Sequence, residues 1–169
     1  MTTPCIRRFH ANSSDDDVLK GIDLTGKTVL ITGTTSGLGA ETARALAMRG
    51  ARVIMANRNM SAAQKVKERI CDAYPEAHVE LLQCDLSSLA SVRDAAIAFL
   101  MRYKQLHVLI LNAGVYGPQP TKSRDGYENT FATNHLGHFY LTKLLMNVLR
   151  SSAPSRVVVV SSICHANTK

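Results

Sequence analysis

Apolar residues along this chain follow two alternating patterns. Short runs rich in valine, isoleucine and leucine predict strands that are buried on both faces. Between these runs, apolar residues recur every three or four positions, which predicts amphipathic helices. The expected strands are residues 27–32, 52–56, 79–84, 107–111 and 156–160, and the expected helices are residues 38–49, 62–73, 89–99 and 127–150.

The regular alternation of strands and helices indicates the fold class. Strands that are apolar on both faces and joined by helical crossovers form parallel sheets with right-handed connections. We therefore expect an α/β fold with a doubly wound, Rossmann-type parallel sheet, truncated after its fifth strand. Residues 1–23 lack the pattern, so we expect a flexible N-terminal lead-in, with Asp15–Asp17 solvated, ahead of a single partial domain at 24–169.

Composition narrows the class of protein further. Hydrophobic residues make up 46% and charged residues 20% of the 169 residues, as in an ordinary globular domain. No apolar run approaches the roughly 20 residues of a membrane span. The N-terminus also lacks the apolar block of a secretory signal. We expect a cytoplasmic protein without a membrane span, whose four cysteines are reduced.

The net charge of +7 does not by itself indicate a nucleic-acid partner. The basic residues are scattered, aromatic residues make up only 5%, and tryptophan is absent, whereas nucleic-acid binding needs a focused basic patch with stacking side chains. A basic balance also suits a protein that binds phosphate groups. His135 and His138 lie one helical turn apart, but we interpret them as packing residues and expect no metal site.

The turn after the first expected strand carries the clearest chemical signal. It reads Thr-Gly-Thr-Thr-Ser-Gly-Leu-Gly from Thr32 to Gly39. Glycines at this spacing permit a tight turn, a close approach of the backbone to a pyrophosphate, and close packing of the helix on the sheet. The start of the following helix offers free amides to phosphates. The predicted dinucleotide contacts in this turn are Gly33, Thr35, Ser36, Gly37, Leu38 and Gly39.

The end of the second strand predicts which dinucleotide binds. Sites for NAD place an acidic residue there to bind the ribose hydroxyls. This chain has Asn57 and Arg58 instead. The planar guanidinium of Arg58 suits a 2′-phosphate, which favours NADP as the cofactor.

Several motifs together resemble the short-chain dehydrogenase/reductase family from about Leu24 to the end of the chain. Beside the glycine turn they are Asp85-Leu86, Asn112-Ala113-Gly114, Asn134 and Ser161-Ser162. The phrases at 57–60, 134–140 and 152–162 are closer still to the retinol-dehydrogenase-like branch. The resemblance implies that Asp85 binds the adenine with Leu86 beside it, and that Asn112, Ala113 and Gly114 line the adenosine side. It also implies two catalytic residues, Ser162 for the substrate oxygen and Asn134 for a bend in the long helix and a water of the proton relay.

One element of that family's pattern is missing from these 169 residues. The family's base is a tyrosine in a Tyr-x-x-x-Lys motif beyond the serine, but only seven residues follow Ser162 and none is tyrosine. In Tyr140-Leu-Thr-Lys143 the lysine comes one position too early. We therefore expect an NADP-dependent oxidoreductase of alcohol or carbonyl groups on apolar substrates such as retinoids or steroids. The 169 residues are expected to be a fragment that is inactive alone.

Two other interpretations stay open. The chain could be a non-catalytic nucleotide-binding or protein-interaction fragment, because its last strand would present a bare apolar edge to a second copy or to a full-length relative. A different doubly wound nucleotide user, such as a methyltransferase, fits the glycine turn and Asn112-Ala113-Gly114 less well.

Overall fold

The centre of the molecule is a sheet of five parallel strands in the order β3-β2-β1-β4-β5. The computed structural model describes residues 9, 10, 12–117, 119 and 121–162. The strands are β1 (Thr28–Thr32), β2 (Arg52–Asn57), β3 (His78–Gln83), β4 (Val108–Leu111) and β5 (Arg156–Val159). Each lies within about one residue of its expected bounds, and the predicted α/β fold class is confirmed.

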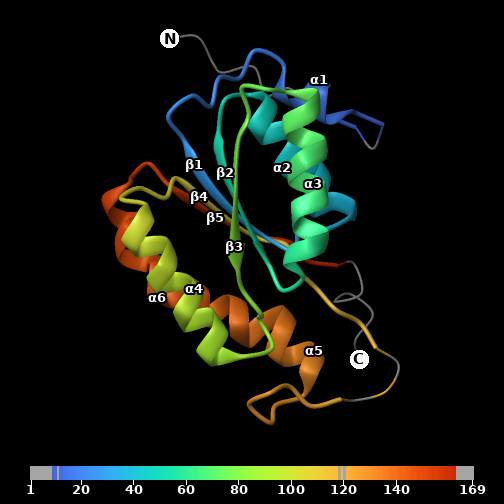
Figure 1. Ribbon diagram of the computed structural model, residues 1–169, viewed down its shortest axis with the longest axis vertical. Helices are drawn as coiled ribbons and strands as arrows, with labels where there is room; N and C mark the ends of the chain where they lie inside the picture. Colours follow the sequence, from blue (N-terminus) through green and yellow to red (C-terminus); the bar gives the residue numbers. More distant parts are fainter. Residues whose placement is uncertain (1–8, 11, 118, 120, 163–169) are drawn as a thin grey trace.

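Helices cover both faces of this sheet (Figure 1). One face carries α2 (Gly37–Met48) and α3 (Met60–Ala73), and the other carries α4 (Leu89–Arg102) and α6 (Gly137–Ser151). Alternate side chains of a strand point to opposite faces, so β1 contributes to two cores. Val29 packs in the core under α2 and α3, whereas Leu30 packs with Phe99 in the core under α4 and α6.

The long helix expected at residues 127–150 is divided in the structure. It consists of α5 (Asn129–Phe131), a π-helical segment η1 (Ala132–Leu136) and α6. It begins at Asn129, just after the expected start near Tyr127, because the Glu128 carboxylate caps the helix by accepting hydrogen bonds from the amides of Thr130 and Phe131 at 2.8 and 2.6 Å. A π-helical segment inserts an extra residue into a helix and often marks a functional position.

Part of the segment expected as a loose lead-in is helical. The short helix α1 spans Asp15–Leu19, and Ser14 begins it with a capping box. The Asp15 carboxylate pairs with Arg44 of α2, and an Asp16 carboxylate oxygen lies 3.9 Å from Arg49. The expectation that this acidic run is merely solvated is therefore wrong. Residues 1–8 and 11 of the lead-in lie outside the described residues.

Two further expectations concern cysteines and membranes. Cys71 and Cys84 carry free thiols, and Cys5 and Cys164 lie outside the described residues. Within the described part of the chain, every helix is too short or too polar to cross a bilayer.

The outer edge of β5 exposes a run of valines. Among the described residues, β5 pairs with β4 on one side and with no strand on the other, and the exposed fractions of Val157 to Val160 lie between 41% and 66%. The apolar edge expected from the sequence is thus present. An exposed, flat, apolar edge strand is a template for pairing with another strand.

We predict that Val158→Lys will reduce self-association of the purified chain. A lysine on an edge strand opposes edge-to-edge pairing because a second strand would have to bury its charge. Size-exclusion chromatography with light scattering should show a smaller aggregated fraction than in the unsubstituted protein. Ile97→Lys is the matched control, since it adds the same charge at a half-exposed apolar position on α4. Equal improvement in both variants would contradict a specific role of the β5 edge.

Candidate functional site

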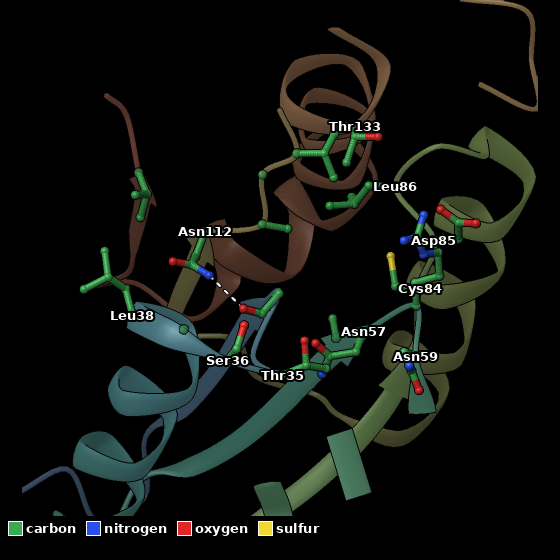
Figure 2. A pocket seen from close by; sticks show the side chains of 18 residues that line it. Thr35, Ser36, Leu38, Asn57, Asn59, Cys84, Asp85, Leu86, Asn112 and Thr133 are labelled. Atoms are coloured by element: carbon green, nitrogen blue, oxygen red, sulfur yellow. Dashed lines mark hydrogen bonds between the residues drawn. The ribbon is translucent and has the colours of Figure 1, made fainter. Parts of the chain in front are cut away.

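A cavity of about 430 Å³ opens at the carboxyl ends of the strands. The strand order explains its position, because the chain moves outward from β1 through β2 and β3 and then crosses to β4 on the other side of β1. Crevices at such reversal points are the usual ligand sites of open α/β sheets. Figure 2 shows Ser36 and Leu38 toward one end of the cavity and Cys84 and Asp85 toward the other.

The cavity brings together most of the residues singled out in the sequence. Every predicted cofactor residue except Gly37 lines it. The sequence reasoning did not single out the remaining lining residues, which are Ala56, Asn59, Cys84, Val115, Thr133 and Val160. These residues are uncharged and belong to no glycine motif, so the sequence contains no local signal that would predict their position at the cavity.

Two glycines of the turn after β1 are required by steric contact. A Cβ on Gly33 would lie 2.7 Å from the Ala113 Cα, and the residue has a φ of +70°. A Cβ on Gly39 would lie 2.1 Å from the Gly33 carbonyl oxygen and 2.5 Å from Asn112 Nδ2. The glycine turn, α2 and the end of β4 are therefore in contact at a distance that only glycine permits.

The N-terminus of α2 differs from those of the next two helices. The caps of α3 and α4, Asn59 and Ser88, each accept a hydrogen bond from an amide of the first turn. The Ser36 side chain makes no such bond, and the first turn of α2 contains no acidic residue. The leading amides of α2 thus have no capping side chain, at the positive end of a twelve-residue helix whose residues Leu38 and Gly39 line the cavity. This arrangement suits an anionic group such as a diphosphate.

The two residues at the end of β2 have different surroundings. Asn57 is buried, and its amide bonds Thr34 twice at 2.7 Å, accepting from the Thr34 amide and donating to its hydroxyl. Its side chain therefore holds the glycine turn rather than projecting freely. Arg58 is exposed at the cavity, and among the described residues no carboxylate forms an ion pair with it.

Of the described residues that line the cavity, Asp85 alone carries a carboxylate. Its Oδ1 accepts hydrogen bonds from the amide and hydroxyl of Ser87 at 3.0 and 2.7 Å, which fixes the side chain. Its Oδ2 lies 3.9 Å from Nε of the exposed Arg124. Burial, together with the charge of Asp85, raises the pKa of the neighbouring Cys84 thiol to about 12. Cys84 is therefore a neutral wall of the cavity and not a nucleophile.

The ends of β1 and β4 are joined by Thr32 and Asn112. The Thr32 hydroxyl oxygen accepts hydrogen bonds from the amides of Asn112 and Ala113, both at 3.0 Å. Asn112 Nδ2 donates to the carbonyl oxygens of Thr32 and Gly33 at 3.0 and 2.9 Å, and Figure 2 draws a bond from this side chain. Thr32 was not predicted as a site residue, although a hydroxyl side chain at the end of a buried strand is a signal that could have indicated it.

The two predicted catalytic residues lie at the cavity's margin rather than among its lining residues. Asn134 belongs to η1, and its amide pairs with the backbone of Val115, accepting at 2.8 Å and donating at 2.9 Å. Ser162 is exposed and follows the lining residue Val160 by two positions. Their catalytic roles stay predictions.

The two histidines of the long helix have different surroundings in the structure. His138 is buried and bonded to Thr32 and Asn134, whereas His135 is exposed and stacks between Phe131 and Phe139. Among the described residues, no group of three or more histidine, cysteine, aspartate or glutamate side chains could hold a metal ion.

Comparison with known proteins identifies the family. The sequence profile described as short chain dehydrogenase matches residues 27–168. The chain belongs to the short-chain dehydrogenase family. The resemblance read from the glycine turn, Asn112-Ala113-Gly114 and the serine pair is therefore confirmed.

Three curated relatives share this part of the fold. The chain is 46% identical over 166 residues to the WW domain-containing oxidoreductase of Gallus gallus, covering 98% of the chain and 40% of that protein. It is 48% identical over 165 residues to the chloroplastic short-chain dehydrogenase TIC 32 A of Brassica napus, covering 95% and 52%. It is 44% identical over 165 residues to retinol dehydrogenase 12 of Mus musculus, covering 98% and 51%. The chain thus spans about half or less of the length of these relatives.

Solved structures of the family share the architecture. A metagenomic short-chain oxidoreductase in complex with NADP superposes with a TM-score of 0.76 at 26% identity, covering 86% of this chain and 66% of the other. This likeness supports a Rossmann-like fold and a nicotinamide dinucleotide as the cofactor of the family.

Proposed function

We propose that this chain forms the NADP-binding part of a short-chain dehydrogenase. The observation that carries the proposal is the uncapped N-terminus of α2 opening beside a glycine turn at the carboxyl edge of the sheet. The amides of Gly37, Leu38 and Gly39 would hold the diphosphate. Asp85 would accept from the adenine amino group, while Asn112, Ala113 and Gly114 would line the adenosine side.

Arg58 supports NADP in preference to NAD. It lies at the position where NAD sites place an acidic residue, and it has no acidic partner among the described side chains. An unpaired guanidinium beside the ribose would be satisfied by a 2′-phosphate, since charge-assisted bonds to phosphate are among the stronger hydrogen bonds. Asn57 and Thr34 would act indirectly by holding the turn in place.

The proposed reaction is the interconversion of an alcohol and a carbonyl on an apolar substrate. The cofactor supplies hydride transfer when bound. Ser162 would donate a hydrogen bond to the substrate oxygen, and Asn134 would hold a water for proton transfer. These 169 residues contain no Tyr-x-x-x-Lys motif, so the chain alone lacks the general base that the family uses. A retinoid or steroid is the proposed substrate class, in line with the name of the retinol dehydrogenase relative.

A second candidate function is non-catalytic interaction through the β5 edge. The exposed valines favour it because they offer an unpaired strand edge to a second copy or to a longer relative.

The proposed compartment is the cytoplasm. Cell fractionation would test this against an organelle such as the chloroplast, where the Brassica napus relative is placed by its name.

An assay of binding and turnover tests the proposed function. The purified chain is titrated with NADPH, and binding is followed by the fluorescence of the nucleotide. The chain is then incubated with NADP⁺ and an apolar alcohol such as retinol. We expect NADPH binding and no turnover. Failure of the folded chain to bind NADPH would contradict the nucleotide site. Alcohol oxidation by the chain would show that another residue supplies the base.

A further inference from the structure

His138 is a buried histidine whose two ring nitrogens both have partners. It comes from the start of α6, and only 4% of the residue is exposed. Its Nε2 lies 2.8 Å from the Thr32 hydroxyl oxygen, across 106 positions of sequence. Its Nδ1 lies 3.0 Å from the carbonyl oxygen of Asn134 in η1. The ring therefore bridges the end of β1 and the π-helical segment.

The hydrogen bonds of Thr32 determine where the ring proton lies. The Thr32 oxygen already accepts from the amides of Asn112 and Ala113, and a hydroxyl oxygen has two acceptor sites. The Thr32 O–H must then donate to His138, so Nε2 is the unprotonated nitrogen. The proton consequently lies on Nδ1 and is donated to the Asn134 carbonyl. Only this neutral tautomer satisfies all the partners.

A charged ring would conflict with these bonds. Protonation of Nε2 would direct a third N–H at the Thr32 oxygen and leave its hydroxyl proton without an acceptor. Burial lowers the pKa of His138; the bond to the Asn134 carbonyl opposes this shift, and the nearby His135 adds to it. The groups that face the ring from β1 and η1, the Thr32 hydroxyl and the Asn134 carbonyl, are uncharged.

The bridge connects the segments that surround the cavity. Thr32 directly precedes Gly33 of the glycine turn, and Asn112 ties the two carbonyls of that turn to the end of β4. Asn134 holds the backbone of Val115, which lines the cavity from the loop after β4. The glycine turn, the end of β4 and η1 therefore share one hydrogen-bonded chain, and His138 is the member that joins its two halves.

We propose that His138 is a positioning residue for the nucleotide site, holding the glycine turn and the Asn112–Val115 segment in register with η1 through its Nδ1–H tautomer. The inference rests on the proposed nucleotide function. His138 does not line the cavity, so it acts through Thr32 and Asn134 and not by contact with the ligand. Substitution of His138 should therefore shift the residues that line the cavity relative to one another, while every lining residue stays present.

His107, which directly precedes β4, provides a matched control because it contacts the end of β1 opposite to Thr32. It is also buried, and its Nδ1 accepts a hydrogen bond from the amide of Thr28 at 3.0 Å. Burial lowers the pKa of His107 as well. It lies at the amino edge of β1, away from the cavity. His107→Asn should therefore affect stability without affecting nucleotide affinity.

The test combines affinity, rescue and a spectroscopic signature. NADPH affinity should fall about tenfold in His138→Phe, as expected when buried polar partners lose their hydrogen bonds. His138→Gln should restore most of it, since its amide oxygen can accept from Thr32. Thermal unfolding is measured in parallel for these variants and for His107→Asn. In the unsubstituted chain, ¹⁵N NMR should show His138 as the neutral Nδ1–H tautomer.

The outcomes separate the inference from the proposed function. A folded unsubstituted chain that fails to bind NADPH overturns the proposed function. Normal NADPH binding together with unchanged affinity in His138→Phe overturns the inference. An Nε2–H tautomer or a charged ring overturns it too, even if the phenylalanine variant does not fold. Equal losses of affinity in His138→Phe and His107→Asn at equal loss of stability would show a merely structural role and overturn it as well.

Discussion

Gly39→Ala should push the first turn of α2 away from the glycine turn after β1. The new Cβ would lie 2.1 Å from the Gly33 carbonyl oxygen, which is backbone and cannot swing away as a side chain could. We expect the free energy of unfolding to fall by about 3 kcal/mol, which is at the upper end of the range for substitutions that add atoms to a packed core. In a domain of this size the melting temperature should fall by roughly 10 °C. NADPH affinity should fall by about tenfold or more, because the displaced amides would no longer converge on the diphosphate.

Gly26→Ala serves as its control. Gly26 also has a positive φ, +76°, but a Cβ there would meet nothing within 4 Å. The expected cost is about 1 kcal/mol from the backbone conformation alone, with unchanged NADPH affinity. Differential scanning fluorimetry and fluorescence titration measure both quantities. If the two alanine variants had equal effects, close packing at Gly39 would not be the reason for its glycine.

Arg58→Gln should remove the preference for the phosphorylated cofactor. Loss of the guanidinium removes a charge-assisted bond of about 1.5–3 kcal/mol, which corresponds to a loss of roughly 10- to 100-fold in NADPH affinity. NADH lacks the 2′-phosphate, so its affinity should change little. Calorimetric titration of both nucleotides into both proteins measures the difference. Because Arg58 is exposed, the substitution should leave the melting temperature nearly unchanged.

Arg124→Gln is a matched control for the loss of one positive charge. Arg124 is also an exposed arginine, and it lies near Asp85, where we propose that the adenine binds. Its substitution should weaken NADPH and NADH by similar factors, if it weakens them at all. A selective loss of NADPH affinity in Arg124→Gln but not in Arg58→Gln would contradict the proposed position of the 2′-phosphate at the end of β2.

Local signals in the sequence predicted the fold and the glycine turn of the candidate site. The strands are continuous apolar runs, and the glycine spacing from Gly33 to Gly39 lies within eight residues, so both can be read without knowledge of distant contacts. Asp85 and Asn112, which the family motifs indicated, both line the cavity, because each follows a strand and the carboxyl ends of parallel strands meet at one edge.

Features that depend on distant contacts could not be predicted. Thr32 and His138 are 106 positions apart, so no local pattern links them. The segment η1 was expected as ordinary helix because apolar periodicity does not distinguish a single π-helical segment from an α-helix. Likewise, no local pattern predicted that the Asn57 amide, which lines the cavity, would be buried and bonded to Thr34.

The central claim is that a diphosphate rests against the leading amides of α2. An NMR titration of the folded, ¹⁵N-labelled chain with NADPH tests it most directly, because each amide reports separately. We expect the largest saturable shifts at Gly37, Leu38 and Gly39, followed by Arg58. If these amides did not shift at saturating NADPH while the spectrum remained that of a folded protein, the nucleotide site would be refuted.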